Sequence, residues 1–420
     1  MSRYNYRNNT AGTLDSTHIY YNINYTDPVS GSDTDSSGNI VELPTNGKDL
    51  VFNFNQNRAA PYLQRPEDYY LSVIRFTIES PNLPVFIAQP VLGSDDPYKT
   101  IYTVTLMGSD NIPHQSPVYW FPEDRTSELP NVPIQLSSIN PTDPFYYCYS
   151  YSYFVQRINI SLDYIWVNSF SGVSGGGPAI YFDAKTNLFT LSGPVSKFRT
   201  SSSGAPIAGD TGIINIYFNV PLLNLLSSLP SKYVAGKVVV ADLCSNLQMD
   251  YLMILSTGSD IPSASTQPYI SNVRLNNLTG VNDVYSTQEY NTLPLWTPIT
   301  AIVYKTSLLT TNPEIIATPV IYSNNNQNLN AGKQNADILN VLTEHYAPLT
   351  NGTEYKPFIY YEPTGEYKLT DLYGKSPIYG IDISVFWKDS YGNLIPFKIG
   401  IGCSATIKIL FRKKTFNSDF

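Results

Sequence analysis

The fold of this chain is decided by Tyr69-Tyr70-Leu71-Ser72-Val73-Ile74-Arg75-Phe76-Thr77-Ile78, near its start, and by Ala405-Thr406-Ile407-Lys408-Ile409-Leu410-Phe411-Arg412, near its end. In each stretch apolar and polar residues alternate, or nearly so, which is the period of a half-buried β-strand. Residues 49–55 and 380–387 show the same pattern. A chain that begins and ends in such strands often pairs its two ends and carries its long middle as an insertion, so we expect an all-β sandwich of the jelly-roll kind.

The expected organisation has three parts. Residues 1–45 are rich in Asn, Ser, Thr, Asp, Gly and Tyr and have little apolar periodicity, which predicts an extended or disordered N-terminal arm. Residues 46–145 together with 370–414 are expected to form the jelly-roll domain, and residues 146–369 an insertion domain that is mostly β and holds the remaining strands. One amphipathic helix is predicted within the insertion by apolar residues that recur every fourth position, namely Phe154, Ile158, Leu162 and Trp166.

The composition favours contact between proteins over contact with nucleic acid. Lys and Arg number 26 and Asp and Glu 34, only 14% of the residues, where globular domains carry about 25%. The 34 tyrosines bring large rings that order at little entropic cost and keep a hydroxyl for hydrogen bonding. The net charge of −8 argues against a nucleic-acid binder. The only dense basic run, Arg412-Lys413-Lys414, is interpreted as keeping a strand end soluble; contact with an acidic neighbouring subunit, a membrane or a genome is the alternative.

The cysteines and the hydrophobic runs also restrict the class of protein. Cys148, Cys244 and Cys403 lie far apart and outside any Cys-x-x-Cys or Cys/His cluster, which argues against a zinc site and a disulfide framework. No apolar run approaches the length of a membrane-spanning helix, and residues 1–7 lack the apolar core of a signal peptide. We therefore expect a protein that is soluble when made.

Motifs that formally match enzymes or metal sites lack their structural context. Gly172-Val173-Ser174-Gly175-Gly176 has the nucleophile-elbow spacing, but a Gly-Pro pair and a strand follow it instead of a helix, and His345 is the only downstream histidine. Residues 33–38 resemble the front of a calcium-binding loop, but Pro44 stands where the bidentate Glu belongs. Residues 95–97 (Asp-Asp-Pro) are predicted to be a turn. His18, His114 and His345 share no metal-ligand spacing. We expect no catalytic, cofactor-binding or metal-binding residues, and hence no enzyme.

Several stretches together resemble the minor capsid (penton) proteins of virophages and polinton-like DNA viruses, over about half of the chain. They are residues 66–78 (PEDYYLSVIRFTI), 83–87 (LPVFI), 290–298 (YNTLPLWTP), 384–389 (SVFWKD), 395–397 (IPF) and 407–414 (IKILFRKK). The resemblance implies a viral jelly roll that forms homopentamers at the vertices of an icosahedral shell, with an insertion domain in the larger members. No site residues carry over, because the work of that family is assembly.

The resemblance also implies partners and a location. The partners would be other copies of the chain, the neighbouring major capsid protein and, through loops at one end of the sandwich, a host receptor or fibre; direct nucleic-acid binding is not expected. The protein would be located in the virion capsid, assembled inside the host cell. Two alternatives stay open. One is a major capsid protein with two jelly rolls and trimeric assembly. The other is a carbohydrate-binding or glycan-degrading β-sandwich on a virion surface, because Tyr and Trp can stack on sugars.

Overall fold

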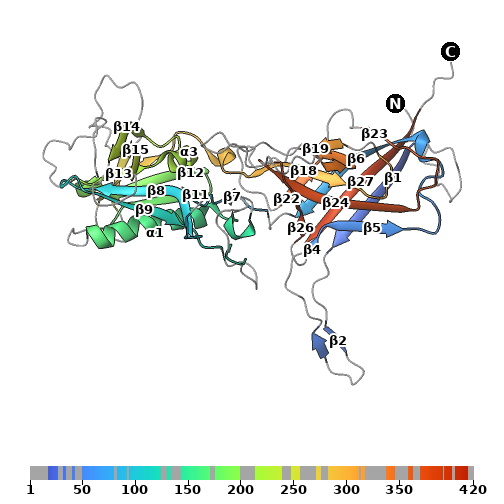
Figure 1. Cartoon of the computed structure of the whole chain (residues 1–420), viewed down its shortest axis with the longest axis horizontal. Helices are drawn as coiled ribbons and strands as arrows, with labels where there is room; N and C mark the ends of the chain where they lie inside the picture. Colours follow the sequence, from blue (N-terminus) through green and yellow to red (C-terminus); the bar gives the residue numbers. More distant parts are fainter. Residues whose placement is uncertain are drawn as a thin grey trace, which may run out of the picture. The chain divides into compact units, whose positions relative to one another are not determined.

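The computed structural model of the chain falls into two compact units (Figure 1). Unit 1 comprises residues 1–83, 299–348 and 356–420, and unit 2 comprises residues 84–298 and 349–355. Within them the structure describes residues 18–26, 32–34, 40–42, 50–79, 83–91, 94–123, 130–133, 143–170, 176–198, 213–238, 247–255, 271–275, 282–311, 314–316, 337–345, 358–362, 369–390, 392–399 and 403–414.

Unit 1 is built around two antiparallel sheets, and each sheet contains strands from both ends of the chain. The first sheet has the order β1 (His18–Thr26), β27 (Ser404–Lys413), β6 (Tyr69–Glu79) and β22 (Phe358–Tyr361), with β23 (Thr370–Asp371) also paired to β6. The second has the order β21 (Val341–His345), β18 (Ile299–Lys305), β24 (Gly380–Asp389) and β25 (Leu394–Pro396), with β5 (Asn53–Asn57) also paired to β24. This interleaving of early and late strands is the jelly-roll arrangement, so the predicted fold class is confirmed.

The last described strand of the chain, β27, lies between β1 and β6, which come from its N-terminal part. β27 pairs with β6 from Ala405 opposite Ile78 to Lys413 opposite Tyr69, with a register shift after Lys408. On its other side β27 pairs with the full length of β1, from His18 opposite Arg412 to Thr26 opposite Ser404. The predicted pairing of residues 69–78 with 405–412 is therefore confirmed.

The expected N-terminal arm needs a correction. Residues 18–26 form β1, and a hairpin follows from β2 (Ser32–Thr34) and β3 (Ile40–Glu42). The sequence HIYYNINYT does alternate apolar residues with Asn, but tyrosines on both phases of the alternation obscure the pattern. The rest of residues 1–45 lies outside the described residues.

The two sheets of unit 1 enclose an apolar core. Phe76 of β6 and Tyr304 of β18 are both fully buried and meet edge to face across the sandwich, with ring centroids 4.7 Å apart. The neighbouring inward residues on both sheets are also buried: Leu71, Val73, Ile78, Ile407, Ile409, Phe411, Ile302, Ile381, Ile383 and Val385. Each such side chain contributes about 1.5–3 kcal/mol by leaving water, so the sandwich is held mainly by this layer.

The boundaries of the units differ from the expected ones of 46–145 plus 370–414 and 146–369. β8 (Lys99–Met107) pairs with β9 (Pro113–Tyr119) and β13 (Asn215–Phe218), which places residues 84–145 in unit 2. β18 pairs with β21 and β24, which places residues 299–348 in unit 1. The alternation of apolar and polar residues shows which face of a strand is buried but not which strand it pairs with. The sequence therefore did not predict these two boundaries.

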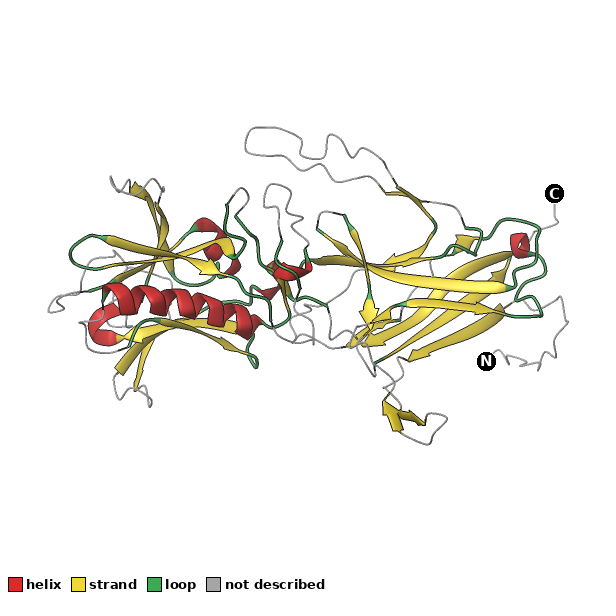
Figure 2. Cartoon of the chain, turned by 60° about the horizontal axis from the view of Figure 1, so that its bottom comes forward, coloured by secondary structure: helices red, strands yellow, loops and turns green. Residues whose placement is uncertain are grey.

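Unit 2 combines two further sheets with one long helix. The five-stranded sheet has the order β14 (Ser231–Val238), β15 (Leu247–Met253), β13, β8 and β9, and the four-stranded sheet has the order β11 (Ala179–Asp183), β12 (Leu188–Pro194), β17 (Asn282–Thr287) and β16 (Ser271–Leu275). Helix α1 (Tyr151–Ser169) contacts β8, β9 and β11 and so lies against both sheets (Figure 2). Phe154, Ile158, Leu162 and Trp166 are all buried, which confirms the predicted helix.

Short elements complete the described parts of both units. They are β4 (Leu50–Val51), β7 (Phe86–Ile87), β10 (Tyr147–Cys148), β19 (Glu314–Ile316), β20 (Asp337–Leu339), β26 (Lys398–Ile399), α2 (Val195–Phe198), α3 (Val220–Leu225), η1 (Pro66–Asp68), η3 (Pro144–Tyr146) and η5 (Leu293–Leu295).

Aromatic side chains around Trp296 form the centre of unit 2. The Trp296 ring is stacked on Phe189, with centroids 5.0 Å apart, and it meets Phe86 at 5.1 Å and Phe154 at 5.4 Å. Its indole N–H donates to the carbonyl of Leu225 over 2.9 Å, so the polar edge of this buried ring is satisfied. The cluster joins α1 to strands distant in sequence.

A buried carboxylate fixes the loop that follows β18. Asp382 of β24 accepts hydrogen bonds from the Thr306 hydroxyl at 2.5 Å and from the Leu308 amide at 2.8 Å. It also accepts from the Ser307 amide at 2.7 Å and from the Ser307 hydroxyl at 2.6 Å. Burial raises the pKa of the Asp382 carboxyl, but these hydrogen bonds outweigh burial and hold its pKa below the usual value.

Replacing Phe76 with Ala is expected to destabilise unit 1 by about 3–5 kcal/mol, because it removes the ring that spans the two sheets and leaves a cavity. Chemical denaturation of the purified variant measures this loss. The matched control is Tyr360→Ala on the neighbouring strand β22, where the side chain is 53% exposed. A Phe76→Ala loss no larger than that of the control would contradict the proposed core.

Replacing Asp382 with Asn is expected to cost about 1–3 kcal/mol at neutral pH, because an amide cannot accept from all four donors. A carboxyl whose pKa is lower in the folded state stabilises the fold above its unfolded pKa of about 3.9 and loses this effect as the pH falls through the folded pKa. The difference between wild type and Asp382→Asn should therefore shrink below about pH 4. Denaturation at a series of pH values checks this, with Asp163→Asn, at an exposed position of α1, as the control. A difference that stays constant down to pH 2 would be evidence against the assigned role.

Candidate assembly surfaces

The formal enzyme and metal motifs of the sequence gain no support from the described residues. Ser174 of the nucleophile-elbow match lies outside them, as do residues 35–38 of the calcium-loop match, and Asp33 lies in β2. Asp96 accepts a hydrogen bond from the amide of Tyr98 at 2.9 Å, which confirms the predicted turn. No helix within the described ranges is long and apolar enough to span a membrane.

The three histidines occupy separate strands. His18 lies in β1 and His345 ends β21, while His114 of β9 belongs to unit 2 and meets the ring of Phe170 edge to face at 5.3 Å. Across the part of the chain that the structure describes, no group of three His, Cys, Asp or Glu side chains is arranged to hold a metal ion. Cys148 is buried, and its thiol donates to the carbonyl of Ser150.

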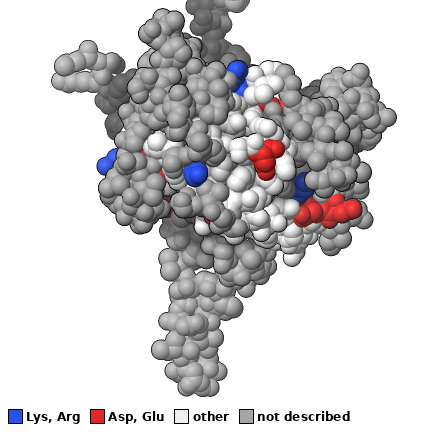
Figure 3. All heavy atoms as spheres, turned by 90° about the vertical axis from the view of Figure 1, so that its left-hand side faces the viewer, with Lys and Arg blue, Asp and Glu red and all other residues white. Residues whose placement is uncertain are grey.

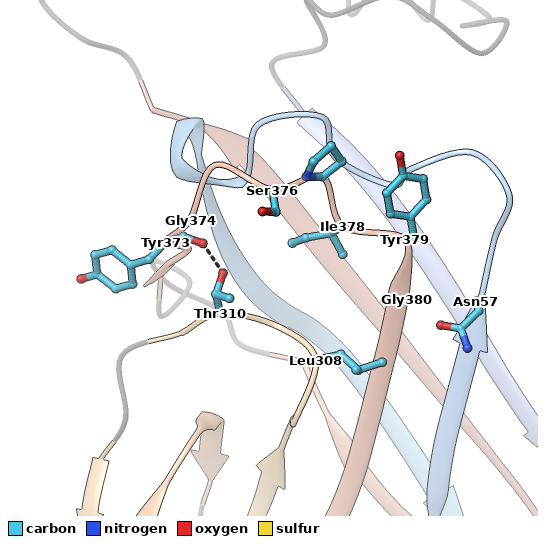
Figure 4. A pocket seen from close by; sticks show the side chains of 10 residues that line it. Asn57, Leu308, Thr310, Tyr373, Gly374, Ser376, Ile378, Tyr379 and Gly380 are labelled. Carbon is cyan, nitrogen blue, oxygen red and sulfur yellow. Dashed lines mark hydrogen bonds between the residues drawn. The ribbon is translucent and has the colours of Figure 1, made fainter.

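Unit 1 has a hollow of about 290 Å³ beside the start of β24 (Figure 4). It is lined by Asn57, Leu308, Thr310, Tyr373, Gly374, Ser376, Pro377, Ile378, Tyr379 and Gly380, none of them charged. A Cβ at Gly380 would meet Oδ1 of Asn57 and a methyl carbon of Leu308, so a larger residue there would require both side chains to move. Since the lining holds no Asp, Glu, Lys, Arg or His, the hollow suits contact with an uncharged group.

The outward side of the first sheet carries cations. Arg75 of β6 stands directly opposite Lys408 of β27, and Arg412 follows on the same side of β27. Arg75 and Arg412 are exposed, and Lys408 is half-buried with its ammonium 5.0 Å from the centre of the Tyr20 ring. We call Arg75, Lys408, Arg412 and Tyr20 the basic face. Among the described residues none of its three cations forms an ion pair.

Unit 2 presents an apolar stripe on α1. Ile160, Tyr164 and Val167 follow one another at helical spacing and are 45%, 63% and 55% exposed. The helix is held to β9 by Ser161, whose hydroxyl donates to the carbonyl of Pro117 at 3.0 Å. Burial raises the pKa of Tyr119 on β9, and Asp96 and Tyr164 raise it further. Such stripes are typical of surfaces that contact other proteins.

Charge is sparse on the described surface that faces the viewer in Figure 3. Uncharged residues fill most of the described surface there, and Lys, Arg, Asp and Glu side chains stand singly or in small groups. A surface of this kind suits broad contact with other proteins better than binding of a polyanion. The sequence singled out only Arg412 of the basic face, as part of the basic run 412–414, and nothing of the hollow, because each surface joins segments far apart in the chain.

Comparisons with known proteins lead to capsid proteins of virophages. Structural protein V19 of the Sputnik virophage is 33% identical over 130 residues, which are 31% of this chain and 56% of V19. This match therefore spans only about half the length of that relative. The uncharacterized protein V18 of the same virophage is 31% identical over 134 residues, which are 31% of this chain and 78% of V18.

Two solved structures share the fold over 95% of the chain. One is a chain of the cryo-EM structure of the Sputnik virophage, at a TM-score of 0.70 and 23% identity, of which 99% is covered. The other is the mavirus penton protein, at a TM-score of 0.58 and 16% identity, of which 100% is covered.

The family model described as Sputnik minor capsid protein V18/19 matches residues 19–413, which is nearly the whole sequence. On this evidence the chain belongs to the Sputnik minor capsid protein V18/19 family.

Proposed function

We propose that this chain forms homopentamers that close the vertices of an icosahedral capsid. The observation that carries the proposal is the architecture of unit 1, a single jelly roll made by both ends of the chain, with the body of unit 2 inserted between β6 and β18. The same fold extends over 95% of the chain in the mavirus penton protein, whose name gives its place in the capsid.

Family membership sets the frame for this proposal. The chain is a minor capsid protein, a structural component of the virion, and its relatives are structural proteins and not enzymes. Its work is therefore to contact other protein chains in a shell, and the finer question is how many copies associate and with which neighbours.

The surfaces of unit 1 suit a ring. A fivefold ring uses head-to-tail contacts in which two unlike patches meet, and it closes only if each contact turns the next copy by the right angle. Unit 1 offers one such patch in the uncharged hollow beside Gly380. The neighbouring major capsid protein is the second partner that we propose. The apolar stripe of α1 is the described surface of unit 2 best suited to meet a receptor or a fibre.

The alternative functions fit the structure less well. A double jelly roll would repeat the strand order of unit 1, whereas the described strands of unit 2 have a different order and pack on the 19-residue helix α1. A glycan-degrading site would need converging carboxylates, and the hollow of unit 1 is lined by uncharged residues alone.

Native mass spectrometry of the purified chain tests the proposal. The expected result is a dominant species of five times the chain mass of 46.9 kDa. A particle reconstruction should place that species at the fivefold axes. A stable monomer, or a trimer as the largest species, would contradict the proposed function.

A further inference from the structure

We propose that the basic face docks the acidic surface of a different capsid chain in the same shell. The inference rests on the proposed place of this chain in the capsid, and it adds which surface makes the contact and which chemistry the neighbour presents. The basic face lies on the outward side of the first sheet, where β1, β27 and β6 run side by side (Figure 1).

The first argument is the pairing of two like charges. Like charges directly opposite each other on neighbouring strands destabilise a sheet, and Arg75 and Lys408 are such a pair. Neither forms an ion pair in the described part of the chain, so no internal carboxylate offsets their repulsion. The next pair on the same face is Thr77 opposite Thr406, which shows that the sheet accepts neutral residues there. The cations therefore serve something outside this chain.

The second argument is the chemistry that surrounds these cations. Tyr20 is 53% exposed, and its ring lies beside the ammonium of Lys408. Further along β27, Arg412 is exposed opposite Tyr70, whose ring lies 5.1 Å from the ammonium of Lys414. Arginine and tyrosine are, with tryptophan, the residues most enriched among those that contribute most of the affinity of protein interfaces. A partner with carboxylates at the strand spacing would satisfy the cations and cover the rings.

The third argument selects the kind of partner. Two copies packed face to face would bring Arg75 and Lys408 against the same cations of the second copy. The outward side of the second sheet is no better, because its described Glu344 is already paired with Lys388 at 3.7 Å and Lys305 lies above the Phe386 ring. Nucleic acid is a less suitable partner, because a phosphate-binding surface needs closely clustered Lys and Arg. On the basic face Thr and Tyr side chains stand beside the cations. A different, acidic capsid chain fits best.

The test uses the full chain, co-expressed with the major capsid protein of the virus that encodes it. Purified shells are analysed by quantitative mass spectrometry for copies of this chain per shell. The variant is Arg75→Glu with Lys408→Glu, and we expect at least about a tenfold loss of incorporation, since reversed charges repel an acidic partner. The milder variant Arg75→Gln with Lys408→Gln removes the charges without reversing them and is less disruptive to folding. Its incorporation should fall at least about threefold.

The matched control is Lys185→Glu with Lys197→Glu, which changes the net charge equally but lies in unit 2. It should incorporate like wild type. Incorporation of wild type should also fall as salt is raised during assembly, because the contact is ionic. Unchanged incorporation of both basic-face variants, or an equal loss in the control, would overturn the proposal.

Two more measurements separate this inference from the proposed pentamer. Native mass spectrometry gives the oligomer of each variant in isolation, and we expect the wild-type mass for all of them. If the Glu variant breaks an oligomer that wild type forms, the basic face joins copies of this chain and the proposal is wrong. It is also wrong if wild type, but not the Glu variant, binds a DNA oligonucleotide in a gel-shift assay. If wild type is not a pentamer but its incorporation still depends on the basic face, the proposed function fails and this inference stands.

Discussion

The pairing of β27 with β6 is the interaction on which the rest of unit 1 depends. It brings residues more than 300 positions apart into one sheet, as the hydrogen bond between the hydroxyl of Ser404 and the carboxylate of Glu79 illustrates. Because this contact closes a very long loop, it forms only after a large loss of chain entropy. The chain reduces that loss by folding most of the intervening residues into unit 2, which has its own sheets and its own aromatic core around Trp296.

The central strand β27 is paired with a neighbouring strand on each edge, and its two faces have different roles. The inward side of β27 contributes Ile407, Ile409 and Phe411 to the core, which accounts for the apolar phase of its alternation. The outward side carries Lys408 and Arg412, and folding does not explain them, because a sheet gains nothing from unpaired cations opposite each other. A capsid protein functions by contacting other protein chains. Charged side chains on an outward sheet face that do not stabilise the fold are therefore candidates for such contacts.

The sequence predicted features that depend on local periodicity. Alternation in residues 69–78 and 405–412 gave the two strands, and apolar residues at every fourth position gave α1. It did not predict features that depend on partner choice. β1 was missed because tyrosines occupy both phases of its pattern, and the unit boundaries were missed because β8 and β18 reveal nothing of their partners. The opposition of Arg75 and Lys408 depends on a register that shifts right after Lys408, which no composition or motif foretells.

The most direct test of the account is a cross-link between the two strands. Thr77 and Thr406 stand directly opposite each other in the register, and paired residues of antiparallel strands have Cα atoms about 4.5–5.5 Å apart, within the range of a disulfide. The double variant Thr77→Cys with Thr406→Cys, made with Cys403→Ser to remove the neighbouring thiol, should form an intrachain disulfide that peptide mapping detects, whereas Thr77→Cys with Arg412→Cys should not. Free thiols at positions 77 and 406 under oxidising conditions would contradict the pairing, and with it the jelly roll made by both ends of the chain.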